Sequence, residues 1–322
     1  MRLWPEDFEP LRAEAQAVVA AGLGAMARSE TDLLTDQLAR ARQAREYMAA
    51  TAMPAPEATD ETIAGVRCRV FRPEQGDAPR ALYLHFHGGG MIGGLPEMND
   101  QGNLALSRRH GIPVVSVDYR LAPEHPYPAG PDDGIAVAAW LLEHAGKSVA
   151  DGGFGTDRLI LGGESAGGYM TAAVLLRMRD ELQAIDRVLG ANVVFGVHDW
   201  GRSPSQRGFR PHGGPDMLDP EGIKFFSDCY LPGRSDEERR DPEISPAFAD
   251  LRGLPPAMLS VGTSDHLLDD TLLLAGRWAA ANGDVELFIG PDLPHGFMAF
   301  PCALTQRWEQ QTDAWFSRIL AG

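Results

Sequence analysis

The sequence predicts a fold of the α/β class, with a mostly parallel central sheet and helices on both faces. Short apolar runs recur along the chain, as expected for buried strands, and longer segments of helical character such as 131–144 lie between them. Hydrophobic residues make up 44% of the 322 residues, which is enough for one large core. The runs expected to be strands are residues 81–86, 112–118, 158–162, 191–197, 256–262 and 284–290.

The first fifty residues are polar, rich in alanine and helix-prone. Residues 29–32 resemble a helix start, with a capping serine followed three residues later by an acid. The residues that would share one face of that helix are Leu33, Leu34, Leu38 and Ala41. A short linker rich in Pro and Ala follows at 53–56, and the core begins after it.

Two further segments complete the order of elements. Residues 63–71 are expected to form a strand, because Val66, Cys68 and Val70 alternate with arginines. Residues 200–233 interrupt the strand and helix rhythm with several prolines, and their last part, 220–230, has helical character.

The most informative motif is the stretch from Gly163 to Gly168, which lies between an expected strand and an expected helix. A G-x-S-x-G pentapeptide in that context is typical of a nucleophile elbow, a turn so tight that only small residues flank the serine. The alternative interpretation is a glycine-rich turn with a helix-capping serine. The elbow interpretation makes Ser165 the nucleophile and places the Ala166 N–H at a helix N-terminus.

A second motif supports the elbow interpretation. The expected strand 81–86 leads directly into His87 and the glycines at 88–90. Bare backbone after a buried strand can direct N–H groups at an oxyanion. A flexible linker is the alternative, but linkers seldom lie between apolar strands.

An acid and a base follow in chain order. Asp265 comes after the expected strand 256–262, and His295 comes after 284–290. The order Ser, Asp, His is that of an α/β-hydrolase triad, and loops after parallel strands gather at one sheet edge. Asp269 and Asp270 are alternative acids, although we expect them to act as charges at a helix N-terminus.

Taken together, these motifs carry a family resemblance. The His-Gly-Gly-Gly loop, Gly-Glu-Ser-Ala-Gly-Gly, residues 118–124 and the His295-Gly296-Phe297 stretch resemble the hormone-sensitive-lipase-like bacterial (family IV) carboxylesterases. The resemblance implies an α/β-hydrolase core with a small helical cap, no cofactor, and hydrolysis of short-chain acyl esters. It implies a cap segment at residues 1–52, a core at 53–322, and a second cap segment at 200–233 within it. The chain departs from the family's usual residues at Glu164, Tyr169 and His266, where the family commonly has Asp, Asn and Pro.

These motifs predict a serine carboxylesterase. His295 would take the proton of Ser165, and Asp265 would orient His295. The N–H groups of Gly89, Gly90 and Ala166 would bind the oxyanion, with Gly88 as the other candidate. Lactone or amide hydrolysis would use the same groups, and a binding protein of this fold without catalysis is a further alternative.

A substrate pocket is expected beside these groups, where bulky residues would favour short acyl chains. The candidates for lining it are Gly88, Met91, Tyr169, His198, Trp200 and Phe297, with Phe225 equally expected to be ordinary packing.

Composition excludes several other classes of function. A net charge of −16 argues against nucleic acid and against an anionic membrane as partners, so we expect a small-molecule ester and allow for a homodimer. No cluster has metal-ligand spacing, and Cys68, Cys229 and Cys302 show no disulfide pattern, so we expect no metal and a cytoplasmic enzyme. A locally basic stretch at 202–212 is expected to be a solvated loop, with recognition of an anionic group as the weaker idea.

Overall fold

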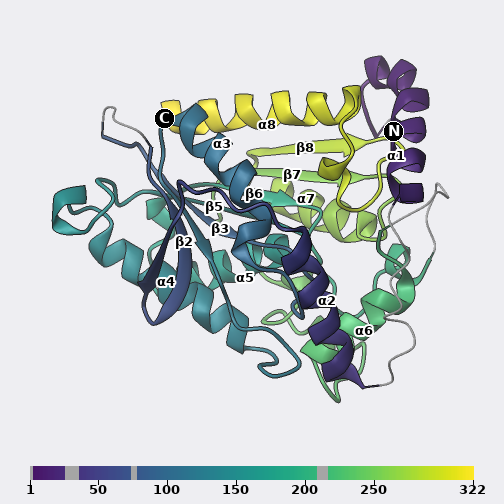
Figure 1. Ribbon diagram of the computed structural model, residues 1–322, viewed down its shortest axis with the longest axis horizontal. Helices are drawn as coiled ribbons and strands as arrows, with labels where there is room; N and C mark the ends of the chain where they lie inside the picture. Colours follow the sequence, from purple (N-terminus) through teal and green to yellow (C-terminus); the bar gives the residue numbers. More distant parts are fainter. Residues whose placement is uncertain (1–2, 26–35, 74–77, 209–216) are drawn as a thin grey trace.

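The computed structural model describes residues 3–25, 36–73, 78–208 and 217–322. Within these residues an eight-stranded sheet runs in the order β1-β2-β4-β3-β5-β6-β7-β8 (Figure 1). β1, β2 and β4 pair antiparallel, and every pairing from β4 through β3 to β8 is parallel. The strands are β1 (Thr59–Ile63), β2 (Val66–Phe71), β3 (Leu82–Phe86), β4 (Val114–Val117), β5 (Leu159–Glu164), β6 (Val188–Val194), β7 (Ala257–Gly262) and β8 (Val285–Gly290).

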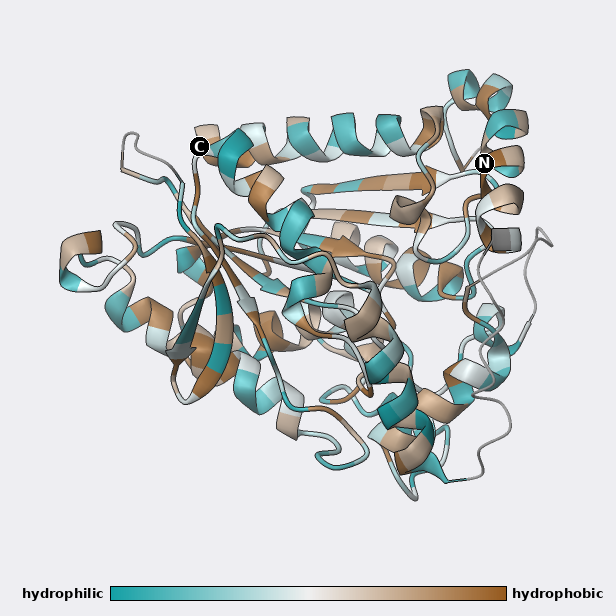
Figure 2. Cartoon of the chain, in the orientation of Figure 1, coloured by the Kyte–Doolittle hydropathy of each residue, from teal (hydrophilic) through white to brown (hydrophobic). Residues whose placement is uncertain are grey.

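Helices cover both faces of this sheet, as predicted. α3 and α8 lie on one face, and α4, α5 and α7 lie on the other (Figure 1). Apolar colour follows the strands and the inner sides of the helices, so the core lies between sheet and helices (Figure 2). The helices are α1 (Arg12–Ala25), α2 (Gln37–Thr51), α3 (Asp100–His110), α4 (Ala129–His144), α5 (Ala166–Asp180), α6 (Pro220–Tyr230), α7 (Leu268–Asn282) and α8 (Ala303–Ala321).

The strand predicted at 63–71 is instead part of a hairpin. Ala64 and Gly65 form its turn, and both have positive φ, the combination that two-residue hairpin turns favour. Arg69, one of the arginines that alternate with the apolar residues of this strand, is itself buried. Its guanidinium binds the buried carboxylate of Asp100, which removes the cost of burying an unpaired charge.

The helices α1, α2 and α6, which belong to the segments expected to form a cap, lie along the side to which the arrowheads of β7 and β8 point (Figure 1). α1 lies against α8 and the loop after β8, where Arg12 Nε donates to Asp292 Oδ2 over 2.6 Å. α2 reaches α6 through Arg40, whose guanidinium carbon lies 4.0 Å from the ring centroid of Phe225. The division into cap segments 1–52 and 200–233 stays a prediction.

The start of α2 differs from the expected helix start. The predicted capping residues 29–32 lie outside the described residues, as do Leu33 and Leu34. In the structure Asp36 caps α2 by accepting the N–H of Leu38 over 3.1 Å. Ala41 is buried, as the predicted helix face requires.

Candidate active site

Ser165 stands at a strained turn between β5 and α5. Its φ of 57° and ψ of −118° lie outside the regions that L-residues favour. A Cβ on Gly163 or on Gly167 would overlap the carbonyl oxygen of Phe86, so both positions require glycine. The structure therefore has the tight geometry that the pentapeptide predicts, with the Ser165 side chain at the carboxyl end of β5.

A continuous chain of hydrogen bonds joins Ser165, His295 and Asp265. His295 Nε2 lies 3.0 Å from Ser165 Oγ, and His295 Nδ1 lies 2.9 Å from Asp265 Oδ2. The other oxygen of the buried Asp265 accepts the N–H of Leu267 over 2.8 Å. Because the Asp265 carboxylate only accepts, Nδ1 carries the proton and Nε2 is left to accept from Ser165. The three residues come from the loops after β5, β7 and β8, as the sequence order predicted.

The glycine loop after β3 lies beside the serine. Gly89 and Gly90 have positive φ, and a Cβ on Gly88 would lie 3.5 Å from Ser165 Cβ. The N–H of Gly88 donates to Glu164 Oε1 over 3.1 Å. Within the described part of the chain, the N–H groups of Gly89, Gly90 and Ala166 meet no hydrogen-bond acceptor. The geometry therefore favours these three over Gly88 as oxyanion donors.

A buried polar chain holds Glu164 in place behind the loop. Glu164 Oε2 lies 3.2 Å from His85 Nε2, and His85 Nδ1 lies 2.8 Å from Ser116 Oγ. Burial acts to raise the pKa of Glu164, but the neighbours of this carboxylate, His85 foremost, together outweigh burial, and the pKa falls below its usual value. Glu164 is therefore a carboxylate that accepts from both His85 and the Gly88 N–H.

His87 braces the same loop from the other side. Its Nδ1 lies 2.7 Å from the carbonyl oxygen of Gly88, and its ring stacks on Tyr119 at 4.3 Å between centroids. Burial lowers the pKa of His87, so the ring is neutral and its Nδ1–H donates to Gly88. The Tyr119 hydroxyl donates to the carbonyl of His87 over 2.7 Å.

An apolar cavity of about 30 Å³ opens next to Ser165. Leu218 and Phe226 line both this cavity and an outer groove of about 490 Å³ between α2 and α6. The groove and the cavity are therefore neighbours, with these two side chains at their common border. The described residues that line the inner cavity are Gly90, Ser165, Ala166, Val197, Trp200, Leu218, Ile223, Phe226 and Leu267.

The predicted pocket needs correction. Trp200 lines the cavity, but Gly88, Met91, Tyr169, His198 and Phe297 are outside its described lining, and the last four are fully buried. The Tyr169 hydroxyl lies 3.0 Å from the Tyr230 hydroxyl and so joins α5 to α6.

The other three residues also have neighbours that explain their burial. Phe297 packs edge-on against Phe195 at 5.3 Å, Met91 faces α4 at Gly130, and the ring of His198 lies against Gly196. Burial lowers the pKa of His198 to about 3, so this ring is neutral. Phe225 lines the outer groove rather than the inner cavity.

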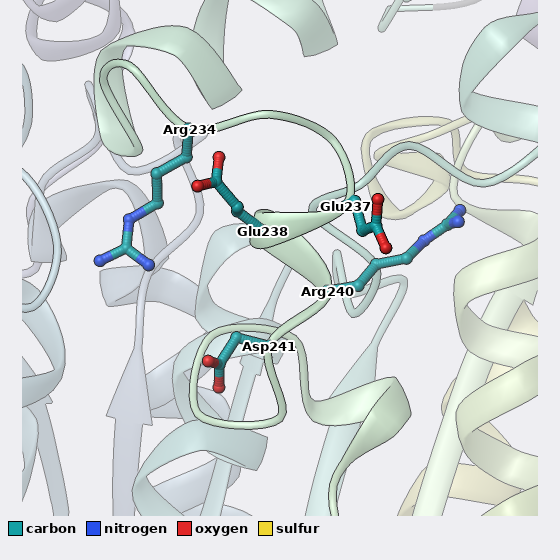
Figure 3. Close-up of a pocket in the computed structure, with 5 residues that line it drawn as sticks. All are labelled: Arg234, Glu237, Glu238, Arg240 and Asp241. Atoms are coloured by element: carbon teal, nitrogen blue, oxygen red, sulfur yellow. The ribbon is translucent and has the colours of Figure 1, made fainter.

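A second hollow, of about 400 Å³, lies on the surface far along the chain from the serine (Figure 3). All its described lining residues are charged, and Figure 3 shows Arg234 and Arg240 extending in opposite directions. Arg240 pairs with Asp199 over 2.9 Å. Among the described residues, this hollow shares no lining residue with the cavity at Ser165.

The basic stretch at 202–212 is described only in part. Arg202 and Arg207 both pair with Asp236, at 2.8 and 2.7 Å, whereas Arg210 and His212 lie outside the described residues. Across residues 3–25, 36–73, 78–208 and 217–322, no group of three or more His, Cys, Asp or Glu side chains is arranged to hold a metal ion. No helix in these ranges is long and apolar enough to span a membrane.

Comparison with known proteins agrees with this geometry. A family model described as the alpha/beta hydrolase fold matches residues 83–299. The carboxylesterase NlhH of Mycobacterium tuberculosis is 34% identical over 74% of this chain and 73% of its own. The acetyl esterase of Salmonella enteritidis is 28% identical over 78% of this chain and 77% of its own. A hormone-sensitive lipase from a metagenome library superposes with a TM-score of 0.73 at 29% identity, covering 96% of this chain and 98% of that one.

Proposed function

Since this chain belongs to the hormone-sensitive-lipase-like carboxylesterases of the α/β-hydrolase fold and is a carboxylic ester hydrolase, we propose that it cleaves short-chain acyl esters through Ser165, His295 and Asp265. The observation that supports this most strongly is the unbroken hydrogen-bond chain from Asp265 to Ser165, which ends beside a small apolar cavity. A nucleophile, a base and an orienting acid in contact form the arrangement that acyl transfer requires.

In the first half of the reaction, Ser165 Oγ attacks the ester carbonyl while His295 Nε2 accepts its proton. Asp265 stabilises the imidazolium that results. The negative charge on the carbonyl oxygen is held by the N–H groups of Gly89, Gly90 and Ala166, and each donor is worth roughly 3–4 kcal/mol in comparable sites. The tetrahedral intermediate collapses, the C–O bond to the alcohol breaks, and His295 returns the proton to the departing alkoxide.

In the second half, water replaces the alcohol. His295 Nε2 removes a proton from the water as its oxygen attacks the acyl-serine, and the same N–H groups hold the second oxyanion. Collapse of this intermediate releases the carboxylic acid and returns the proton to Ser165. The protein's own side chains carry every proton in this cycle.

The small inner cavity supports a preference for short acyl groups. Phe226 stands close to Gly90, since a Cβ on Gly90 would lie 2.7 Å from Phe226 Cδ2, and the cavity encloses only about 30 Å³. A methylene that does not fit a pocket costs about 1–3 kcal/mol, so acyl chains of about two to six carbons should exceed longer ones in kcat/KM. A small soluble ester is the proposed substrate, and a cytoplasmic location and a homodimer stay predictions.

A series of p-nitrophenyl esters of increasing acyl length tests this proposal, with one lactone and one anilide beside it. We expect the highest kcat/KM at or below about six carbons. A maximum at about twelve carbons, or a rate that jumps above the substrate's solubility limit, would contradict the short-chain preference. Higher kcat/KM for the lactone or the anilide than for every ester would contradict the ester preference.

A further inference from the structure

The carboxylate of Asp270 lies buried between α7 and the loop after β6, and the mechanism above does not use it. Its Oδ1 accepts the N–H of His198 over 2.7 Å and the N–H of Asp199 over 2.8 Å. These two amides are consecutive, and they lie directly between Val197 and Trp200, which both line the cavity at Ser165. Asp270 therefore binds the backbone at the point where this wall of the cavity is formed.

The rest of the loop is bound to the same carboxylate. Ser203 Oγ donates to Asp270 Oδ2 over 2.7 Å, and Gln206 Nε2 lies within 2.9 Å of both carboxylate oxygens. Every one of these neighbours donates to the Asp270 carboxylate, so this one side chain accepts hydrogen bonds from four residues of the loop. The interpretation of Asp270 as a charge at a helix N-terminus is therefore incomplete.

Ser205, on the loop that follows β6, is hydrogen-bonded to the segment that carries the triad acid Asp265. Ser205 Oγ donates to the carbonyl of His266 over 2.8 Å, and His266 Nδ1 donates to the carbonyl of Ser205 over 2.8 Å. Asp269 Oδ2 accepts the N–H of Ser205 over 2.9 Å. The Ser205 end of this loop, outside the cavity lining, is thereby tied to the segment from Asp265 to Asp270. His266, at the position where the family commonly has proline, takes part in this tie.

We propose that Asp270 is a positioning residue that sets the shape of the acyl cavity by holding the backbone between Val197 and Trp200. It acts through Trp200 and Val197 and touches no reacting atom. The proposal rests on the proposed function only in assigning an acyl group to the cavity. The hydrogen bonds that hold this wall of the cavity are present without any bound substrate.

The charge state of Asp270 provides a signature of this role. Burial raises the pKa of Asp270 to about 7, although its hydrogen bonds act to lower it. The titratable and charged groups around it are the neutral His198, the ion pair of Asp199 with Arg240, and Asp265, His266 and Asp269 on its own segment. A protonated Asp270 has one oxygen that donates, so as the pH falls one of its contacts must change, by reversal of the Ser203 hydroxyl or by a turn of the Gln206 amide.

Two variants on the same helical turn make the matched comparison. Asp270→Asn is nearly isosteric, but its NH2 group must replace one acceptor among neighbours that all donate. Asp269→Asn removes a neighbouring carboxylate whose contact lies at Ser205, outside the cavity lining. We expect Asp270→Asn to change the ratio of kcat/KM for p-nitrophenyl acetate and hexanoate by about fivefold or more, mainly through KM. Asp269→Asn should leave the ratio within about twofold. A folded Asp270→Asn protein with the wild-type ratio overturns the proposal.

A second measurement needs no substrate, so it separates a failure of this proposal from a failure of the proposed function. The difference in tryptophan fluorescence between the wild type and Trp200→Phe reports on Trp200 alone. We expect this difference to change between about pH 5.5 and 8.5 with a midpoint near 7. The same change should appear in an Asp269→Asn background and vanish in an Asp270→Asn background. A flat wild-type profile, or an unchanged profile with Asp270→Asn, overturns the proposal.

Ser203→Ala provides an independent variant in case Asp270→Asn does not fold. It removes the hydroxyl donor at Oδ2 and leaves the carboxylate in place. Because that hydrogen bond favours the ionised form, its loss should move the fluorescence midpoint to higher pH. A midpoint that stays in place, or moves to lower pH, contradicts the role given to Asp270.

Discussion

Replacing Asp265 with asparagine should abolish almost all ester hydrolysis while the fold is kept. The structure fixes how the new amide would sit, because the Leu267 N–H at 2.8 Å requires an oxygen at the Oδ1 position. The NH2 group must then face His295 Nδ1, which at present lies 2.9 Å from Asp265 Oδ2. Two donors do not bond, so His295 would move its proton from Nδ1 to Nε2. That tautomer cannot accept the proton of Ser165.

The size of the effect follows from this change of tautomer. The same substitution in a comparable triad lowers kcat by about 10⁴-fold, which corresponds to about 5.5 kcal/mol of transition-state stabilisation. We expect a loss of this order in kcat for p-nitrophenyl acetate, with KM changed far less. Circular dichroism and thermal unfolding should match the wild type, since the variant keeps the Leu267 contact and adds no volume.

A matched control distinguishes the effect of the changed His295 tautomer on kcat from the effect of losing one negative charge. Asp269→Asn removes a carboxylate four residues away that accepts the N–H of Ser205, and we expect the variant to stay within about twofold of the wild type. If Asp265→Asn kept a tenth or more of the wild-type kcat, the argument from tautomer and geometry would be refuted. A loss of kcat in Asp269→Asn as large as in Asp265→Asn would contradict the assignment of Asp265 as the triad acid.

Three further outcomes are expected. Glu164→Ala leaves the Gly88 N–H without its acceptor. Because misplacing catalytic groups by about 1 Å costs about 100-fold in rate, kcat should fall by that order with KM nearly constant. An unchanged kcat would show that the glycine loop keeps its conformation without Glu164. Phe226→Ala should move the maximum of kcat/KM in the p-nitrophenyl ester series to longer acyl chains, because Phe226 lines the cavity. An unchanged maximum would show that the acyl group does not bind against Phe226. The raised pKa of Asp270 stabilises the folded state fully below the usual value of 3.8, and this stabilisation is lost as the pH rises through about 7. In urea unfolding, the wild type should therefore lose stability relative to Asp270→Asn as the pH rises toward 7, by at most about 1.4 kcal/mol per pH unit, and parallel pH profiles would argue against the raised pKa.

The sheet and the positions of the site residues could be predicted because each depends on local sequence. Ser165, Asp265 and His295 each follow an apolar strand, and the carboxyl ends of parallel strands meet at one edge whatever the rest of the chain does. The hairpin at Ala64 was missed because its first strand, Thr59–Ile63, is polar and mostly exposed, with Ile63 as its one buried residue. No apolar alternation therefore marks that strand, and the turn shows only in the Ala-Gly pair.

The walls of the cavity could not be predicted in the same way. Met91 and Tyr169 follow the glycine loop and the serine closely in sequence, but their side chains point into the core. Ile223 and Phe226 come from α6, and only the packing of that helix over the sheet edge brings them near Ser165. Their spacing of three residues on an expected helix was the one available signal.

The role of Asp270 was hidden for a different reason. Two adjacent acids at a helix start fit a helix-dipole role equally well, and sequence does not say which of them turns inward. Gly88 is the opposite case, because a carboxylate at Glu164, one residue before the nucleophile, was a visible acceptor for a loop N–H. Only the structure shows that the N–H of Gly88, rather than that of Gly89 or Gly90, meets this acceptor.

The central claim is that Ser165 is the nucleophile, and intact-mass spectrometry with peptide mapping after treatment with a fluorophosphonate tests it most directly. The account predicts one adduct per chain, on Ser165, with no adduct and negligible ester turnover in a folded Ser165→Ala protein. An adduct on any other residue, or ester turnover by Ser165→Ala near the wild-type rate, would contradict it.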